Sequence, residues 1–158
     1  MLVRDAREDD VSSICAIAAE TWWATYSELM EEDSIRTCIT EYYEPGLVRS
    51  QIADAAAGPD AHFLILEADG LAIGYLHYEV MDDRGPYMRR LYILPAHQGH
   101  GWGAMLVEEL HRRLGPGNSY ELDVHPKNTQ AIAFYQSYGA EFTGDHIPPC
   151  WDLMRVLT

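Results

Sequence analysis

The spacing of apolar residues predicts alternating helices and strands along the chain. Residues 2–6 read as a first strand, and between residues 11 and 22 the apolar positions recur every three or four residues. That period is typical of a helix with one buried face. Another helical stretch is predicted from about Asp33 or Ser34, and Pro45 is suited to the first turn of a third, short helix that ends at Gly58.

The second half of the pattern predicts a hairpin followed by a strand, a helix and a strand. Two β-rich runs, 62–68 and 71–80, are separated by Asp69-Gly70, a pair typical of a tight turn between antiparallel strands. Further elements are expected as strands at 87–94, 119–124, 141–143 and 151–156 and as helices at 102–114 and 129–138. The elements between 87 and 124 should form a parallel, right-handed βαβ unit.

Length and composition indicate one domain over residues 1–158. The chain has 158 residues, 47% of them hydrophobic, which suffices for one core and is too short for two typical domains. No apolar run approaches the roughly 20 residues that cross a bilayer. Residues 1–6 lack the charged and apolar pattern of a leader. We therefore expect a soluble, cytoplasmic protein with no membrane partner.

The cysteines favour reduced thiols over a disulfide framework. Cys15, Cys38 and Cys150 are odd in number and far apart in the sequence. We expect all three to be small core residues. No Cys and His spacing fits a zinc site, so no metal is expected.

The net charge of −14 argues against a nucleic-acid partner. Lys and Arg together number 11 against 25 acidic residues, and Lys127 is the only lysine. Binding to a phosphate backbone needs a basic surface, which these scattered arginines do not provide. A strongly acidic surface either concentrates a cationic substrate or reflects a high-salt host, and composition leaves both explanations open.

A glycine-rich segment predicts an anion-binding site. Residues 91–104, Leu-Tyr-Ile-Leu-Pro-Ala-His-Gln-Gly-His-Gly-Trp-Gly-Ala, place a strand before three alternating glycines and a helix. Such a turn directs successive main-chain N–H groups and the positive end of the helix at one point. The spacing fits neither the dinucleotide fingerprint nor the P-loop.

Two ordered blocks identify a family that the chain resembles. Gln98, Gly101 and Gly103 fit the pattern Gln/Arg-x-x-Gly-x-Gly/Ala. The second block, 128–140, is similar to Asn-x-x-Ala-x-x-Phe-Tyr-x-x-x-Gly-Phe. Both patterns are those of the GCN5-related N-acetyltransferases, and the resemblance covers nearly the whole chain. It implies an α/β fold with a central, mixed, mostly antiparallel sheet flanked by helices.

The resemblance also implies acetyl-CoA as co-substrate. The main chain of Leu91, Tyr92 and Ile93 would hold the pantetheine arm, and an N–H near Tyr92 or Ile93 would stabilise the oxyanion. Asn128 would cap its helix and reach the pantetheine amide. The other residues expected around the cofactor are Gln98, Gly99, His100, Gly101, Trp102, Gly103, Ala104 and Tyr135.

Three residues are candidates for the proton transfers. Tyr135 matches the family's tyrosine that protonates the departing thiolate. Asp123 lies in Leu122-Asp123-Val124, where some family members have Leu-Glu-Val, and is the first candidate for the base. Other members carry a glutamate in the stretch that corresponds to 87–90, which has no carboxylate here. Glu79 and His77 are therefore alternatives, and an amine already partly neutral would need no strong base.

The acceptor is expected to be a primary amine, in a small molecule or polyamine or in a protein. Trp22, Trp23 and Tyr26 follow the first helix where this family builds its acceptor wall, and aromatic rings hold alkylammonium groups. Dimers are common in the family, so a homodimer stays open. A non-catalytic acyl-CoA sensor is the alternative function, which the missing strand carboxylate favours and Tyr135 opposes.

Overall fold

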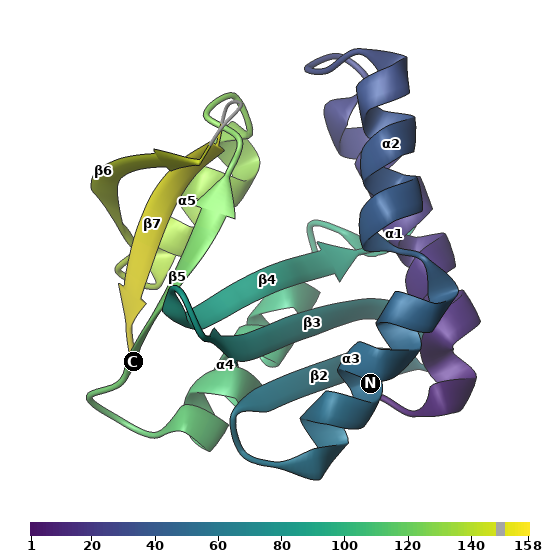
Figure 1. Cartoon of the computed structure of the whole chain (residues 1–158), viewed down its shortest axis with the longest axis horizontal. Helices are drawn as coiled ribbons and strands as arrows, with labels where there is room; N and C mark the ends of the chain where they lie inside the picture. Colours follow the sequence, from purple (N-terminus) through teal and green to yellow (C-terminus); the bar gives the residue numbers. More distant parts are fainter. Residues whose placement is uncertain (148–150) are drawn as a thin grey trace.

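A seven-stranded sheet forms the centre of the computed structural model, which describes residues 1–147 and 151–158 (Figure 1). Its strands lie in the order β1-β2-β3-β4-β5-β7-β6, and only the β4–β5 pair is parallel. The strands are β1 (Leu2–Asp5), β2 (Ala61–Ala68), β3 (Leu71–Met81), β4 (Gly85–Ile93), β5 (Ser119–Val124), β6 (Glu141–Ile147) and β7 (Trp151–Leu157). The predicted mixed, mostly antiparallel sheet is confirmed.

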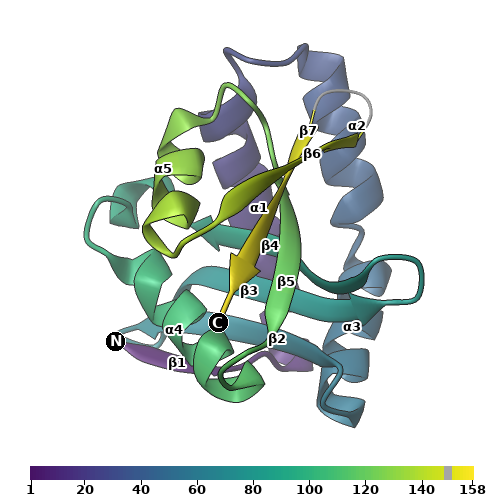
Figure 2. The ribbon, with the colours of Figure 1, turned by 90° about the vertical axis from the view of Figure 1, so that its left-hand side faces the viewer.

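Helices cover both faces of this sheet. The helical segments are η1 (Glu8–Asp10), α1 (Val11–Tyr26), α2 (Glu32–Tyr42), α3 (Pro45–Ala57), η2 (Pro95–His97), α4 (Trp102–Leu114) and α5 (Thr129–Ser137). Helices α1 and α3 pack on one face of β2–β4 and α4 packs on the other. Helix α2 rises beyond the end of the strands in both views (Figures 1 and 2) and buries only Ile35 completely among its residues.

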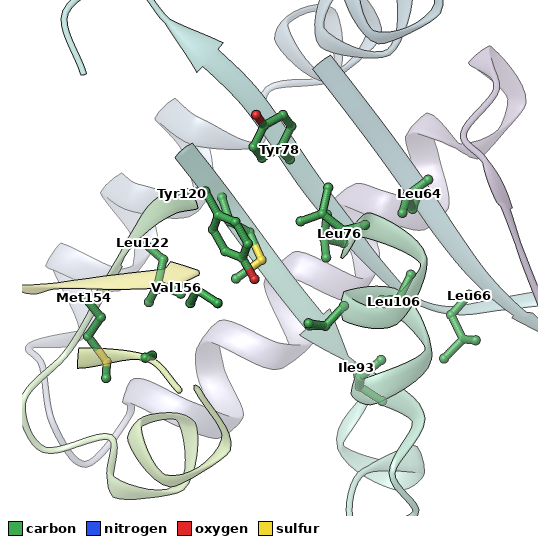
Figure 3. Close-up of a cluster of buried hydrophobic side chains, with 14 of the residues drawn as sticks. Leu64, Leu66, Leu76, Tyr78, Ile93, Leu106, Tyr120, Leu122, Met154 and Val156 are labelled. Atoms are coloured by element: carbon green, nitrogen blue, oxygen red, sulfur yellow. The ribbon is translucent and has the colours of Figure 1, made fainter. Parts of the chain in front are cut away.

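Alternation along the strands builds a hydrophobic core on each face. Leu64 and Leu66 of β2 face the α4 side, and Phe63 and Ile65 face the α1 side. On the α4 side, Leu106 belongs to one cluster of buried side chains with residues of β2, β3, β4, β5 and β7 (Figure 3). The aromatic and aliphatic side chains of α5 pack against this same cluster, so both helices that follow the glycine-rich segment share one core.

Strands β4 and β5 separate soon after they meet, and this divergence creates the site. Within the described residues they pair directly only at Tyr87 and Glu121. A bulge against β3 falls at Arg89, because Tyr78 pairs with Met88 whereas His77 pairs with Arg90. Bulges bend a strand and increase its twist. Figures 1 and 2 show β5 crossing steeply away from β4.

The prediction that the cysteines are small core residues is only partly right for the two thiols that the structure describes. Cys15 and Cys38 are only partly buried, at the edge of the core on the α1 side. Helical spacing placed them on apolar stripes, and each packs against the core from within its helix without being fully enclosed by it. Cys150 lies outside the described residues. None of the described helices combines the length and apolar character that crossing a bilayer requires.

Candidate active site

A cavity of about 1120 Å³ opens where β4 and β5 diverge, between α1, α2 and α5. It brings together the predicted site residues except Glu79, His100 and Ala104. The predicted residues that line it are Leu91, Tyr92, Ile93, Gln98, Gly99, Gly101, Trp102, Gly103, Asp123, Asn128 and Tyr135. Residues separated by more than 40 positions in the sequence therefore share one chamber.

The end of β4 offers its main chain to this cavity. Beyond Tyr87, β4 is paired with β3 along one edge, through Tyr92 and Ile93, while β5 has moved away from the other edge. The side chains of Leu91 and Ile93 pack with the core on the α4 side, and Tyr92 packs on the α1 side. An exposed strand edge can take an added extended segment by main-chain hydrogen bonds. The structure thus places such an edge where the pantetheine arm is expected.

The glycine turn after β4 presents unpaired donors. Gly99 and Gly101 adopt left-handed backbone angles, with φ of 79° and 77°. In the described part of the chain, the main-chain N–H groups of Gly99, His100 and Gly101 have no hydrogen-bond partner. The N–H of Ala104, in contrast, already donates to the carbonyl of Gly101 at 3.0 Å. The donors for an anion therefore come from the turn itself.

The anion site is built without a Lys or Arg side chain in the turn. Residues 95–104 contain no Lys or Arg, and no side chain caps the N-terminus of α4. The helix dipole and free N–H groups are the positive elements there. This arrangement reconciles a polyanionic ligand with a chain whose net charge is −14.

Arg90 organises the opposite side of the cavity. Its buried guanidinium donates to Gln51 Oε1 and to the main-chain carbonyl of Tyr42, each at 2.8 Å, and stacks 4.6 Å from the ring centre of Tyr43. Tyr42 is the last residue of α2, where the helix dipole favours a cation. Arg90 thereby ties the end of α2 to the sheet.

Helix α5 contributes Asn128 and Tyr135 to the cavity. Asn128 Oδ1 accepts a hydrogen bond from the N–H of Ala131 at 3.1 Å and so caps the helix, as expected. Burial raises the pKa of Tyr135 above its usual value, so its phenol stays protonated at neutral pH. A neutral phenol inside the cavity is able to donate a proton.

Asp123 projects into the cavity from β5 and is held by a residue that the sequence did not single out. The hydroxyl of Tyr87 donates to Asp123 Oδ1 at 2.5 Å. Burial raises the pKa of Asp123, while the hydrogen bond from Tyr87 opposes the rise. A raised pKa strengthens the carboxylate as a base. No pattern in the sequence signalled Tyr87, because its role depends on the pairing of two distant strands.

Glu79 lies outside the cavity on β3. Its carboxylate is 3.4 Å from His77 Nε2 and forms an ion pair with Arg89. These two contacts lower the pKa of Glu79 to about 2. Burial lowers the pKa of His77 to about 4. The structure therefore does not bring Glu79 or His77 together with Tyr135, and Asp123 is the better-placed carboxylate.

Aromatic side chains form the wall next to β4. Trp22 and Tyr26 line the cavity, whereas Trp23 faces Arg36 of α2 at 5.2 Å and does not. Trp22 Nε1 donates to the hydroxyls of Tyr43 and Tyr92 at 2.9 and 3.1 Å. Trp22 is thus part of a hydrogen-bonded set of rings, and Trp22, Tyr26 and Tyr43 are all buried.

The exposed side of the cavity is lined by one stripe of α2. Asp33, Thr37 and Glu41 recur at four-residue intervals and all line the cavity. Among the acidic residues between α1 and the first turn of α2, Asp33 lines the cavity, whereas Glu28, Glu31 and Glu32 do not. The cavity lining therefore carries the carboxylates of Asp33 and Glu41 on α2, of Asp83 in the turn before β4 and of Asp123 on β5, together with Arg84, Arg89 and Arg90.

Comparison with known proteins identifies the family. The family model described as "Acetyltransferase (GNAT) family" matches residues 20–140, more than half of the chain. A spermidine N(1)-acetyltransferase of Thermoplasma acidophilum is 25% identical over 139 residues, which cover 87% of this chain and 86% of that protein. A peptidyl-lysine N-acetyltransferase of Salmonella typhimurium, YjaB, is 42% identical over 60 residues, covering 38% of this chain and 39% of that one.

A solved structure supports the fold over the full length. The crystal structure of the PaiA N-acetyltransferase from Thermoplasma acidophilum in complex with coenzyme A matches with a TM-score of 0.87 and 22% identity, covering 99% of this chain and 98% of that chain. Matching strands, turn and helices at this level show a common fold. Together with the family match, they show that this chain belongs to the acetyltransferase (GNAT) family and is an N-acetyltransferase.

Proposed function

We propose that the chain transfers the acetyl group of acetyl-CoA to a primary amine by direct attack in a ternary complex. The observation that carries this proposal is the continuous run from the open edge of β4 to the free N–H groups of the glycine turn, with Asp123 and Tyr135 in the same cavity. These donors and this edge fit a long polyanionic ligand with an extended amide-bearing arm.

Each residue has a distinct task in the proposed reaction. The main chain of Leu91, Tyr92 and Ile93 holds and orients the extended arm, and an N–H of Tyr92 or Ile93 stabilises negative charge on the carbonyl oxygen. Asp123 accepts the proton of the attacking amine, directly or through water. Tyr135 returns a proton to the leaving sulfur. Acetyl-CoA supplies the thioester, and no metal ion takes part.

We further propose a small cationic amine, such as a polyamine, as the acceptor. Carboxylates of Asp33 and Glu41 line the cavity from α2, and the rings of Trp22 and Tyr26 suit an alkylammonium group. The similarity to a spermidine acetyltransferase supports the same class. A protein amino group is the alternative class, to which the similarity to the peptidyl-lysine enzyme points.

The test is acetyl-CoA-dependent thiol release, at low and molar salt, with polyamines, small monoamines, aminoglycosides and peptides that carry free amino groups. Turnover with polyamines is expected, with a higher KM in Glu41→Gln and an unchanged KM in Glu28→Gln, which changes an acid outside the cavity. Preference for peptides would overturn the polyamine class. Tight binding of acetyl-CoA with no turnover for any acceptor would overturn the enzymatic proposal in favour of a sensor.

Activity that requires molar salt would indicate that the acidic surface is an adaptation to a high-salt host. Activity at low salt with cationic acceptors, weakened by added salt, would instead link the charge to substrate attraction. The oligomeric state and the cytoplasmic location stay predictions.

A further inference from the structure

The hydrogen bond between Tyr87 and Asp123 spans the point where β4 and β5 part. Tyr87 is the β4 residue that pairs with Glu121 of β5, and Asp123 lies two positions further along β5. The Tyr87 ring is buried and both residues line the cavity. The 2.5 Å bond therefore joins the two strands inside the cavity, next to the place where they diverge.

The Asp123 carboxylate has no basic side chain bonded to it among the described residues. Arg84 lies over the ring of Tyr87, 5.6 Å from its centre, and its closest acidic contact is Asp83 at 3.9 Å. Arg89 is engaged by Glu79. The hydroxyl of Tyr87 is thus the side-chain donor that fixes the orientation of this carboxylate.

We propose that Tyr87 is a positioning residue that holds Oδ1 of Asp123 so that Oδ2 faces the incoming amine. This inference rests on the proposed function and on Asp123 as its base. A carboxylate that is free to rotate presents its basic oxygen in the reactive direction for only part of the time, and fixed geometry lowers the barrier. The aromatic side chain reaches from one strand to the other beside Tyr87↔Glu121, the direct β4–β5 pair among the described residues.

Tyr87 keeps its proton throughout the reaction. Burial and the charge of Asp123 raise its pKa above the usual value, so the phenol does not pass its proton to the carboxylate. In this step, one ammonium proton moves to Asp123 Oδ2, the neutral amine forms the C–N bond, the C–S bond breaks and Tyr135 protonates the sulfur. The nitrogen then passes its second proton to the Tyr135 phenolate, directly or through water, and Asp123 releases its proton to solvent.

The groups that face Asp123 determine its pH response. They are Tyr87 and Arg89 from β4, Arg84 from the turn before it, Tyr135 from α5 and Tyr43 from the segment after α2. Of these, Tyr87 alone donates a side-chain hydrogen bond to the carboxylate. Removing a donor to the ionised form raises the pKa of a carboxyl group.

The decisive experiment is the pH profile of kcat for Tyr87→Phe at saturating acetyl-CoA and acceptor. The plateau should fall on the order of tenfold, and the acidic limb should move to higher pH by about one unit. Affinity for coenzyme A should stay unchanged. Tyr78→Phe is the matched control, because Tyr78 is buried outside the cavity and stacks on His62. An unchanged profile in Tyr87→Phe would overturn the proposal.

A double variant separates positioning from other effects. In an Asp123→Asn background, Tyr87→Phe should cause no further loss of kcat, whereas an equal loss in both backgrounds would show that Tyr87 acts independently and overturn the proposal. If Tyr87→Phe fails to fold, 3-fluorotyrosine at position 87 keeps the ring and makes a stronger donor, so the acidic limb should move to lower pH. An unmoved limb would overturn the proposal.

The experiments distinguish failure of the proposed acetyl transfer from failure of the proposed role of Tyr87. A wild-type protein without turnover for any acceptor overturns the proposed function, and this inference with it. Wild-type turnover together with an unaltered Tyr87→Phe profile overturns the role of Tyr87 alone.

Discussion

The side-chain amide of Gln98 donates a hydrogen bond to the main-chain carbonyl of Ile93, at 2.9 Å. The bond joins the end of β4 to the start of the glycine turn and thereby closes the intervening segment on itself. Gln98 was predicted as a cofactor residue. The structure indicates that it contributes by holding the turn in shape, so that the free N–H groups converge.

We predict that Gln98→Leu lowers the affinity for coenzyme A by roughly threefold to tenfold. A typical hydrogen bond contributes about 0.5–1.5 kcal/mol net, and here its loss loosens the turn before the ligand binds. Isothermal titration calorimetry measures the effect. Gln98→Arg, the other residue that the motif allows, should retain most of the affinity. Equal affinity in wild type and Gln98→Leu would show that the hydrogen bond from Gln98 to Ile93 does not contribute to binding of coenzyme A.

Gly74 of β3 permits the close approach of β4 at the position expected for the thioester. A Cβ atom at Gly74 would lie 2.7 Å from the carbonyl oxygen of Tyr92 and would also overlap with Ile93 Cδ1. Because a main-chain oxygen is one of the clashing atoms, a side-chain rotation alone does not relieve the contact. We predict that Gly74→Ala destabilises the fold by about 1–3 kcal/mol and weakens binding of coenzyme A.

Urea unfolding followed by circular dichroism tests this prediction, with Gly58→Ala as control. Gly58 has nothing within 4 Å of an added Cβ and an extended backbone with φ of −168°. The control should match the wild type in both stability and affinity. A stable Gly74→Ala variant would mean that β3 and β4 adjust at this point without cost.

Local patterns predicted much of the fold. The Asp69-Gly70 turn, the glycine segment and the apolar spacing of α1 and α4 each depend on residues close together in sequence, and each lies where expected. The second helix begins at Glu32, one residue before the predicted range. Gly139, with φ of 76°, follows α5 in the left-handed conformation expected of a helix cap.

Features set by the pairing of distant segments were not predictable in this way. The bulge at Arg89 and the divergence of β5 depend on strand register, and they determine that Asp123 meets Tyr87. The same dependence left Glu79 as an alternative to Asp123 for the base. Nothing in the sequence around it indicates that its strand position directs it to Arg89 and away from the cavity.

Tyr135→Phe should separate catalysis from cofactor binding. The variant keeps the ring that packs against Phe134 and the core but loses the proton donor. We expect kcat to fall on the order of 10²- to 10⁴-fold, with the affinity for coenzyme A largely unchanged. Thiol-release kinetics and calorimetry provide the two readouts. Tyr138→Phe, which changes a ring packed on His111 outside the cavity, should leave both unaltered.

Asp123→Asn should lower activity while it stabilises the fold at neutral pH. Burial raises the pKa of Asp123 in the folded protein above its value in the unfolded chain. The folded state therefore binds the proton more tightly, and the free energy of unfolding decreases as pH rises through this range. Asparagine has no charge to bury, and its Oδ1 still accepts the bond from Tyr87. The gain should be largest near pH 7 and vanish below about pH 3, where the aspartate is protonated in both states.

The same variant should lose kcat by about 10²-fold or more, since the amide accepts no proton. Urea unfolding at pH 7 and at pH 3, set beside thiol-release kinetics, measures both effects. Asp9→Asn changes an exposed carboxylate and should alter neither quantity. A loss of stability at pH 7 would show that the ionised carboxylate stabilises the fold through its contacts. Full activity in Asp123→Asn would instead show that another group is the base, or that the acceptor binds as the neutral amine and needs no base.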